Sequence, residues 1–268
     1  MGGFPLAFAD AQFAACKEVE AFYSGTVSPV LHRSLSQTVE HNTYLGLMLR
    51  THGWLRTLGK LTEPADFQAA LAASRALFEV AVDITLLLKA PSDAVRVAAW
   101  EEQAKLKSAE GLKKFLDAHP AAKPPGASEV LKLLQRAPAI EALRLQHWGT
   151  TKYVSRWTKR TLRDDAIAAD AFLHSGFEEY YSARYPVACW CVHGSGLAGI
   201  RGVPSDAFPG IIAFAFADAA SFSMLIGERA LRLVGAWDDI LEFRFKGLRE
   251  SVEAARLRVW LERGAPSV

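Results

Sequence analysis

Apolar residues recur three and four positions apart along almost the whole chain, which is the spacing of a helix with one buried face. No segment alternates apolar and polar residues in the manner of a half-buried β-strand. Proline, glycine and capping residues divide this pattern into expected helices at about 8–23, 29–58, 62–89, 92–118, 128–136, 138–147, 161–171, 175–195, 205–234 and 238–263. The sequence therefore predicts an all-α protein, a single multi-helix bundle with long central helices that spans residues 1–268.

One segment interrupts the helical pattern more strongly than the others. Residues 119–128 read His-Pro-Ala-Ala-Lys-Pro-Pro-Gly-Ala-Ser, a composition that disfavours helix. We interpret this segment as a connecting loop between helices, or as a weak domain boundary.

The helix expected at 62–89 has an unusual distribution of charge. Around residues 74–88 nearly every direction of the helix is apolar, which indicates a central position in the bundle. The only charges there, Arg75, Glu79 and Asp83, lie four residues apart on one stripe. Because an unpaired buried charge is costly, this charged stripe either pairs with polar groups of other helices or lines a functional pocket.

A second segment, residues 177–195, embeds polar groups among large apolar residues. Its candidates are Tyr181, Arg184, His193 and Ser195. Gly194 marks a helix end, where the helix dipole favours a protonated His193 for purely structural reasons. Alternatively, His193 is an acid–base group that exchanges protons near neutral pH. We expect this segment to face the charged stripe across the core, because neither has a partner nearby in sequence.

The net charge of the chain is only +2, but the charge is unevenly distributed. Residues 128–163 carry eight basic and two acidic side chains, whereas residues 164–241 carry four and ten. Five bases would form one basic stripe on a continuous helix, with Tyr153 and Trp157 beside it: Lys152, Arg156, Lys159, Arg160 and Arg163. The motif Thr161-x-x-Asp164 is typical of a helix N-cap, which would break the stripe. We expect salt-sensitive binding of nucleic acid or another polyanion here, or else a solvated or intersubunit basic face.

Composition narrows the class of protein. With 50% hydrophobic and 22% charged residues the chain can bury a substantial core. Three cysteines are too few for a disulfide framework, which favours a reducing, cytoplasmic compartment. The most apolar stretch, residues 207–227, carries Asp218 at its middle, so we interpret it as a buried helix and expect no membrane partner. The motifs of di-iron, zinc-protease and nucleotide-binding sites are missing, so we expect neither metal nor cofactor.

The two polar segments resemble an uncharacterised bacterial family, domain of unknown function 5677. The likeness rests on the Arg75-x-x-x-Glu79 helix, on the basic stretch that begins at Trp157, and on the Tyr-rich helix that ends in Val-His-Gly-Ser. It covers about residues 70–196, and Cys189 departs from the pattern, which has a small polar residue there. The resemblance implies a helical bundle in which these segments pair, and it implies no activity.

A looser likeness is to the HEPN (higher eukaryote and prokaryote nucleotide-binding) helical bundles. Many of these are metal-independent RNases that use an arginine and a histidine of one short motif. Here Arg184 and His193 are nine residues apart, which places them on opposite faces of a straight helix, although Pro186 would kink it. This departure weakens the RNase interpretation.

Two functions stay open at this point. The first is a cytoplasmic bacterial defence or toxin-like effector that acts on RNA or nucleotides through a central polar pocket. Its catalytic residues would be His193, Arg184 and Glu79, and its pocket would be lined by Arg75, Asp83, Tyr181 and Ser195. The second is a non-enzymatic binding or scaffold protein, which we expect to be a homodimer. An electropositive pocket mouth favours the first function, whereas a pocket sealed by satisfied ion pairs favours the second.

Overall fold

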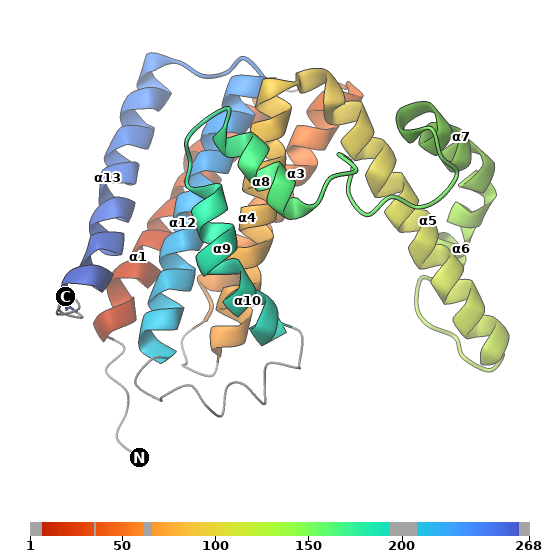
Figure 1. The fold of residues 1–268 in the computed structure, drawn as a ribbon, viewed down its shortest axis with the longest axis horizontal. Helices are drawn as coiled ribbons and strands as arrows, with labels where there is room; N and C mark the ends of the chain where they lie inside the picture. Colours follow the sequence, from red (N-terminus) through yellow and green to blue (C-terminus); the bar gives the residue numbers. More distant parts are fainter. Residues whose placement is uncertain (1–6, 35, 62–65, 193–207, 263–268) are drawn as a thin grey trace. The chain divides into compact units, whose positions relative to one another are not determined.

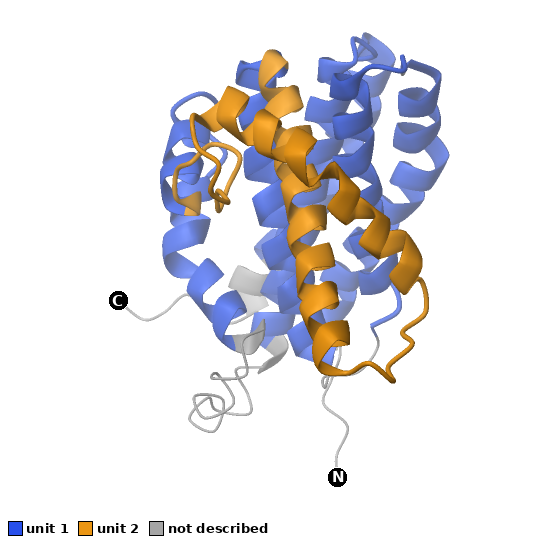
Figure 2. Ribbon diagram, turned by 90° about the vertical axis from the view of Figure 1, so that its right-hand side faces the viewer, with its two compact units in different colours: residues 1–91, 163–268 blue, residues 92–162 orange. Residues whose placement is uncertain are grey.

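The computed structural model describes residues 7–34, 36–61, 66–192 and 208–262. Every regular element in these residues is helical, which confirms the all-α prediction. The chain divides into two compact units, coloured separately in Figure 2: unit 1 is residues 1–91 with 163–268, and unit 2 is residues 92–162. The proline-rich segment lies inside unit 2 and does not mark the division.

Unit 1 is built mainly of long helices that lie side by side (Figure 1). Its helices are α1 (Ala7–Phe22), α2 (Ser28–Ser34), α3 (Val39–Leu58), α4 (Phe67–Lys89), α8 (Leu162–Asp170), α9 (Phe177–Ala183), α10 (Tyr185–Val192), α12 (Phe208–Leu233) and α13 (Asp239–Glu262), with a π-helical turn at Tyr23–Val27. Helix α4 packs against α12, α3 and α10, and α12 also contacts α1 and α13. The short helices α9 and α10 cross in front of α12 and α4 in Figure 1.

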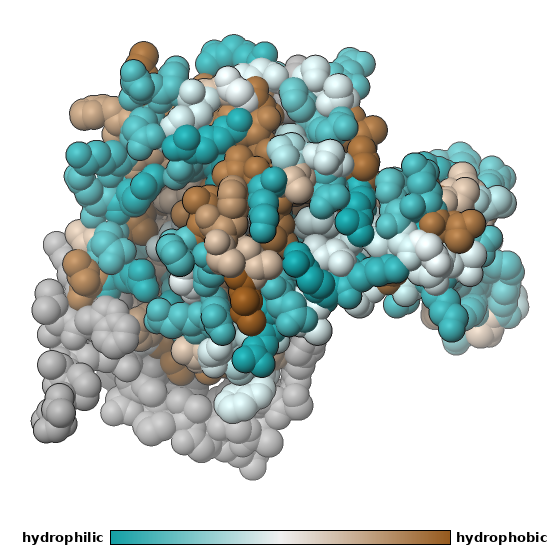
Figure 3. Space-filling view, turned by 45° about the horizontal axis from the view of Figure 1, so that its top comes forward, coloured by the Kyte–Doolittle hydropathy of each residue, from teal (hydrophilic) through white to brown (hydrophobic). Residues whose placement is uncertain are grey.

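Helix α4 forms the centre of unit 1, as its apolar pattern predicts. Its buried residues lie on nearly every side of the helix, and Leu77 and Phe78 are fully inaccessible. The charged stripe of Arg75, Glu79 and Asp83 is the partly exposed side. Burial of each large apolar side chain contributes about 1.5–3 kcal/mol, so α4 anchors the bundle. The face of the protein shown in Figure 3 is more polar than this central helix: hydrophilic side chains surround a band of hydrophobic ones there.

The prediction of a single helix at 29–58 is wrong, because a non-helical segment separates α2 from α3. Thr38 is extended, and its side-chain oxygen accepts a hydrogen bond from the backbone nitrogen of His41 at 3.2 Å, which is an N-cap. The backbone nitrogen of Ser36 donates to His41 Nδ1 at 2.8 Å. These local hydrogen bonds replace the backbone bonds that a continuous helix would form there.

The helix expected at 175–195 is also two helices, α9 and α10. Arg184 ends α9, and Pro186 follows in the first turn of α10. Proline has no N–H to donate to the carbonyl four residues earlier, and its ring crowds that carbonyl. Pro186 therefore prevents α9 from continuing, and a new helix, α10, begins directly after Arg184.

Helix α12 is the most apolar long helix. Its portion Gly210–Leu233 is long and apolar enough to cross a membrane, yet 78% of the residues in its most apolar window are buried inside the protein. Asp218, in the middle of this helix, is only 5% exposed. A buried helix with one carboxyl group inside the bundle is the arrangement that the sequence predicted.

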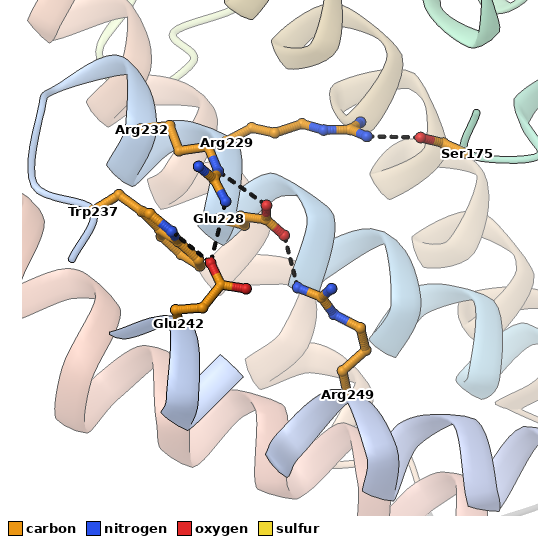
Figure 4. Close-up of polar contacts among 7 residues, drawn as sticks. All are labelled: Ser175, Glu228, Arg229, Arg232, Trp237, Glu242 and Arg249. Carbon is orange, nitrogen blue, oxygen red and sulfur yellow. Dashed lines mark hydrogen bonds and ion pairs between the residues drawn. The ribbon is translucent and has the colours of Figure 1, made fainter. Parts of the chain in front are cut away.

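Polar contacts fix the end of α12 to its neighbours (Figure 4). Glu228 accepts a hydrogen bond from Arg249 of α13 at 2.8 Å. Arg229 is buried, and its Nη2 donates to Ser175 Oγ in the loop before α9 at 2.7 Å. Burial lowers the pKa of Arg229 to about 10, so the guanidinium stays charged. These contacts fix α13 and the start of α9 on α12.

Unit 2 contains α5 (Ala94–Ala118), α6 (Ala127–Lys132) and α7 (Ala137–Trp148), with 3-10 turns at Pro91–Asp93 and Leu133–Arg136. Helix α5 contacts α6 and α7. An irregular segment follows α7, and side chains hold its backbone. Gln103 Nε2 donates to the carbonyl of Val154 at 2.7 Å, and Trp148 Nε1 donates to the carbonyl of Trp157 at 2.8 Å.

Candidate functional site

Aromatic side chains around Phe78 hold α9 and α10 against α4. The Phe78 ring centroid lies 4.7 Å from Tyr180, 5.9 Å from Phe177 and 5.4 Å from Tyr185. Phe222 of α12 adds a fourth ring at 5.5 Å. Each such pair contributes about 0.5–1.5 kcal/mol beyond the area that it buries. The cluster therefore fixes the positions of the two tyrosine hydroxyls beside the polar residues of α4.

Tyr180 and Ser74 form a hydrogen bond in the core. Their side-chain oxygens are 2.8 Å apart, and both residues are 1% exposed. Burial raises the pKa of the Tyr180 phenol, and the charge of Asp218 adds to the rise. The phenol therefore stays protonated at neutral pH and remains a hydrogen-bond donor.

Two members of the charged stripe bind one tyrosine of α10. Tyr185 Oη donates to Glu79 Oε1 at 3.0 Å, and Arg75 Nε lies 3.2 Å from both of these oxygens. Burial, followed by the charge of Glu79, raises the pKa of Tyr185. The pairing of the stripe with the Tyr-rich segment is therefore present, and Arg75, Glu79 and Tyr185 each contact the other two.

Arg184 forms an ion pair with Asp218 of α12. Arg184 Nη1 and Asp218 Oδ1 are 3.2 Å apart. Burial raises the pKa of Asp218 to about 7, although the charges of Arg184 and Arg256 oppose the rise. Desolvation therefore outweighs the ion pair, and this carboxyl group titrates near neutral pH.

A cleft of about 190 Å³ opens beside this ion pair. Its polar lining is Ser74, Tyr180, Arg184 and Asp218, and its apolar lining is Leu71, Val187, Ile211, Phe214 and Ala215. The Arg184 guanidinium lies 5.3 Å from the Tyr180 ring centroid, and its Nε has no hydrogen-bond partner among the described residues. The cleft thus combines a cation whose buried Nε–H has no partner, a titrating carboxyl group and an apolar wall.

The predicted site residues do not all meet in this cleft. Arg184 lines it, whereas Arg75 and Glu79 belong to the neighbouring Tyr185 network. Tyr181 stacks on Tyr185 at 5.1 Å, and Asp83 stays on the partly exposed side of α4. The two remaining candidates, His193 and Ser195, lie outside the described residues.

Sequence reasoning missed Asp218, Tyr180 and Ser74 as site residues. Asp218 had a usable signal, because a carboxyl group in the middle of an apolar helix must find a partner or titrate. Tyr180 and Tyr181 are adjacent, and nothing in the sequence distinguishes the one that faces the core. Among the described residues, no three histidine, cysteine, aspartate or glutamate side chains group as metal ligands.

The expected basic stripe does not form, because residues 149–161 are not helical. The Trp157 indole, expected beside the stripe, is buried, and Tyr153 packs 4.5 Å from the Arg144 guanidinium. Lys159 has a left-handed backbone (φ 62°), and its Nζ donates to the carbonyl of Trp148. The other members are spread over two units: Lys152, Arg156 and Arg160 lie in unit 2, and Arg163 lies on α8 of unit 1. Polyanion binding by these residues stays a hypothesis.

A serine, a histidine and a glutamate also meet where α1 and α3 adjoin. Ser24 Oγ lies 3.0 Å from His52 Nε2, and Glu20 Oε1 lies 3.3 Å from the same nitrogen. In a hydrolytic triad the acid and the nucleophile bind opposite nitrogens of the ring. This cluster therefore lacks the geometry of a proton relay.

A family model described as "Family of unknown function (DUF5677)" matches residues 41–203 of the chain, more than half of its 268 residues. The match includes α4, α9 and α10, which carry most of the polar groups described above, whereas Asp218 lies beyond it. None of the curated proteins matches the chain, and none of the solved structures does.

Proposed function

The chain belongs to the DUF5677 family of unknown function, and from the geometry of its own cleft we propose that it binds a small organic anion between Arg184 and Asp218. The anion is a phosphate or a carboxylate that carries a short apolar group. The proposed function is binding of this anion. In this proposal Asp218 exchanges a proton with the bound molecule.

The observation that carries the proposal is the incomplete hydrogen bonding of the Arg184 guanidinium beside an open cleft. Its Nη1 contacts Asp218, while its Nε is buried and has no hydrogen-bond partner among the described residues. A guanidinium presents its N–H groups in a planar fork that matches the oxygens of a phosphate or carboxylate. The neutral phenol of Tyr180 lines the same cleft and supplies a further polar group.

The pKa of Asp218 links anion binding to proton uptake. With the carboxyl group ionised, Arg184 is already neutralised by its ion pair. With the carboxyl group protonated, the guanidinium keeps its full charge for a ligand, and Asp218 becomes a donor. Because this pKa is about 7, the switch between the two states falls in the physiological range.

The size of the cleft limits the ligand. About 190 Å³ is less than the roughly 300–1,000 Å³ of pockets that enclose a drug-sized molecule. The cleft therefore suits a small anion or the anionic end of a longer molecule, and it is too small for a whole nucleotide. Within the broader hypothesis of an effector that acts on RNA or nucleotides, this favours contact with a terminal phosphate.

The second candidate function, a non-enzymatic scaffold, is supported by the Tyr185 network. Arg75, Glu79 and Tyr185 hydrogen-bond to one another, and such a network stabilises a fold without requiring a ligand. The HEPN-type RNase hypothesis needs His193, which lies outside the described residues.

Isothermal titration calorimetry with inorganic phosphate, propyl phosphate and butyrate tests the proposal. Butyrate is the reference ligand for pH dependence, because its carboxylate stays ionised over the range used. We expect butyrate affinity to fall about tenfold from about pH 6 to about pH 8, following the protonated fraction of Asp218. Arg184→Gln should abolish binding of all the ligands.

Arg56→Gln is the matched control, because Arg56 is an exposed arginine on α3 of the same unit. It should bind like the parent protein. Equal binding by Arg184→Gln, or an affinity for butyrate that rises with pH, would contradict the proposal.

A further inference from the structure

Helix α13 has an inner face and an outer face. Its inner residues Leu241, Phe245, Val252 and Ala255 are buried against the bundle. Figure 1 shows α13 lying lengthwise beside α1 and α12. Glu242 near its start accepts a hydrogen bond from Trp237 Nε1 at 2.8 Å, which with the Arg249 contact fixes the helix on unit 1 (Figure 4). The outer face is therefore held in one orientation.

The outer face carries large apolar side chains at the spacing of a coiled-coil seam. The seam consists of Ile240, Phe243, Gly247, Glu250, Ala254 and Leu257, which alternate three and four residues apart. Phe243 is 78% exposed, Ile240 is 71% exposed and Leu257 is 51% exposed. Single exposed apolar residues are common, but here Ile240 and Phe243 adjoin at one end of the seam and Leu257 lies on the same face at the other end, which is typical of an interaction surface.

A hollow of about 430 Å³ lies along the seam between Phe243 and Glu250. It is lined by Phe22, Phe243, Arg244, Lys246, Gly247 and Glu250. A Cβ atom at Gly247 would meet nothing within 4 Å, so the glycine leaves open space there. The hollow thus offers room beside two basic side chains, Arg244 and Lys246, and one acidic side chain, Glu250.

Charge is arranged along the seam in opposite halves. Along and beside the seam, the first half carries the exposed bases Arg244 and Lys246 together with the acid Asp239. The second half carries the exposed acids Glu250 and Glu253, the latter 3.7 Å from Arg256. In a parallel pair of such helices, like charges would face each other. In an antiparallel pair the basic half of each helix faces the acidic half of the other.

We propose that the outer face of α13 docks on the same face of a second copy of this chain, with the two helices antiparallel. The register that matches the seam places Ile240 against Leu257 and Phe243 against Ala254 of the second copy. Gly247 then faces Glu250 of the second copy, whose carboxylate enters the hollow beside Arg244 and Lys246. Lys246 flanks Glu253 of the second copy, and the two-fold axis repeats every contact once.

Sedimentation equilibrium across a range of protein concentrations tests this interface. The parent chain should form a dimer that weakens as salt is raised. Phe243→Glu should give a monomer with an unchanged circular dichroism spectrum, because Phe243 makes little contact within its own chain. Leu145→Glu is the matched control: Leu145 is a 58% exposed leucine in unit 2, and its replacement should leave the dimer intact.

Charge reversal tests the antiparallel register independently of the apolar contacts. Lys246→Glu alone and Glu253→Lys alone should each raise the dissociation constant about tenfold, because each reverses two symmetry-related pairs. The double variant restores both pairs and should dimerise like the parent. A chain that is monomeric at every concentration, a dimer unaffected by Phe243→Glu, or a double variant as weak as the single ones would overturn the proposal.

Discussion

The hydroxyl groups of Ser74 and Tyr180 lie 2.8 Å apart in the core of unit 1, although the two residues are separated by 106 positions in sequence. This hydrogen bond joins the central helix α4 to α9 at the inner wall of the Arg184 cleft. A buried polar group is costly only when it loses its partner, so the contact has a measurable signature.

Removing both hydroxyls should cost less than the sum of the costs of removing each one alone. Ser74→Ala leaves the Tyr180 phenol without its partner, and Tyr180→Phe leaves the serine without its own; each should lower the free energy of unfolding by about 1–3 kcal/mol. The double variant should lose less than the sum of the two. Urea unfolding of the four proteins gives the coupling energy, and additive losses would show that the hydroxyls do not interact.

Asp218 should make stability fall as pH rises. Its pKa is about 7 in the folded protein and near 3.8 in an unfolded chain, so the folded state binds the proton more tightly. Its contribution is therefore complete below the unfolded pKa and is lost as pH rises through about 7. Asp218→Asn cannot titrate, so its urea midpoint should vary less between about pH 5 and about pH 8.

Asp117→Asn serves as the control for this measurement. Asp117 is an exposed aspartate in unit 2, and its replacement should keep the pH profile of the parent protein. At the alkaline end, Asp218→Asn should be at least as stable as the parent, because burial of the carboxylate outweighs its ion pair with Arg184. An identical pH profile in the parent and Asp218→Asn would exclude titration of Asp218 near neutrality.

Alanine at Gly227 should destabilise the bundle. A Cβ atom there would lie 3.0 Å from the hydroxyl and 3.3 Å from the ring of Tyr23, a fully buried residue whose hydroxyl donates to the carbonyl of Ser223. The tyrosine cannot move without losing this bond, so we expect a loss of about 1–3 kcal/mol. Gly53→Ala, at an open position on α3, should instead stabilise by up to about 1 kcal/mol, and calorimetry distinguishes the two.

The Tyr185 network should contribute modestly to stability. Glu79→Ala removes a partner from both Arg75 and Tyr185, but the Arg75 and Glu79 side chains are 23% and 27% exposed. Because water can replace part of the lost contact, we expect a loss of about 1 kcal/mol in urea unfolding. Asp117→Ala, which breaks the exposed Lys113 pair of the same spacing, should cost almost nothing. Equal losses would mean that the network adds nothing beyond a surface ion pair.

Local pattern determined the helical class and the central position of α4, because a helix that is apolar in nearly every direction is stable only when other helices surround it. It also identified the two polar segments, and it indicated a kink at Pro186, since proline acts on its own turn, but it did not predict two separate helices there. The end of α2 at Ser34 was missed because the Thr38 cap competes with helix formation by the same residues. Small differences in free energy decide whether the helix continues or a new one begins.

Only the tertiary structure decided which side chains meet. Whether Tyr180 or Tyr181 enters the core depends on the rotation of α9 after the chain breaks, and adjacent residues of a helix differ by about 100° in direction. Asp218 of α12 and Arg184 at the end of α9 meet in a cleft that Ser74 of α4 also lines, and the raised pKa of Asp218 follows from its burial there. Helix formation is encoded over a few neighbouring residues, whereas the partners, burial and protonation of a side chain depend on helices that are distant in sequence.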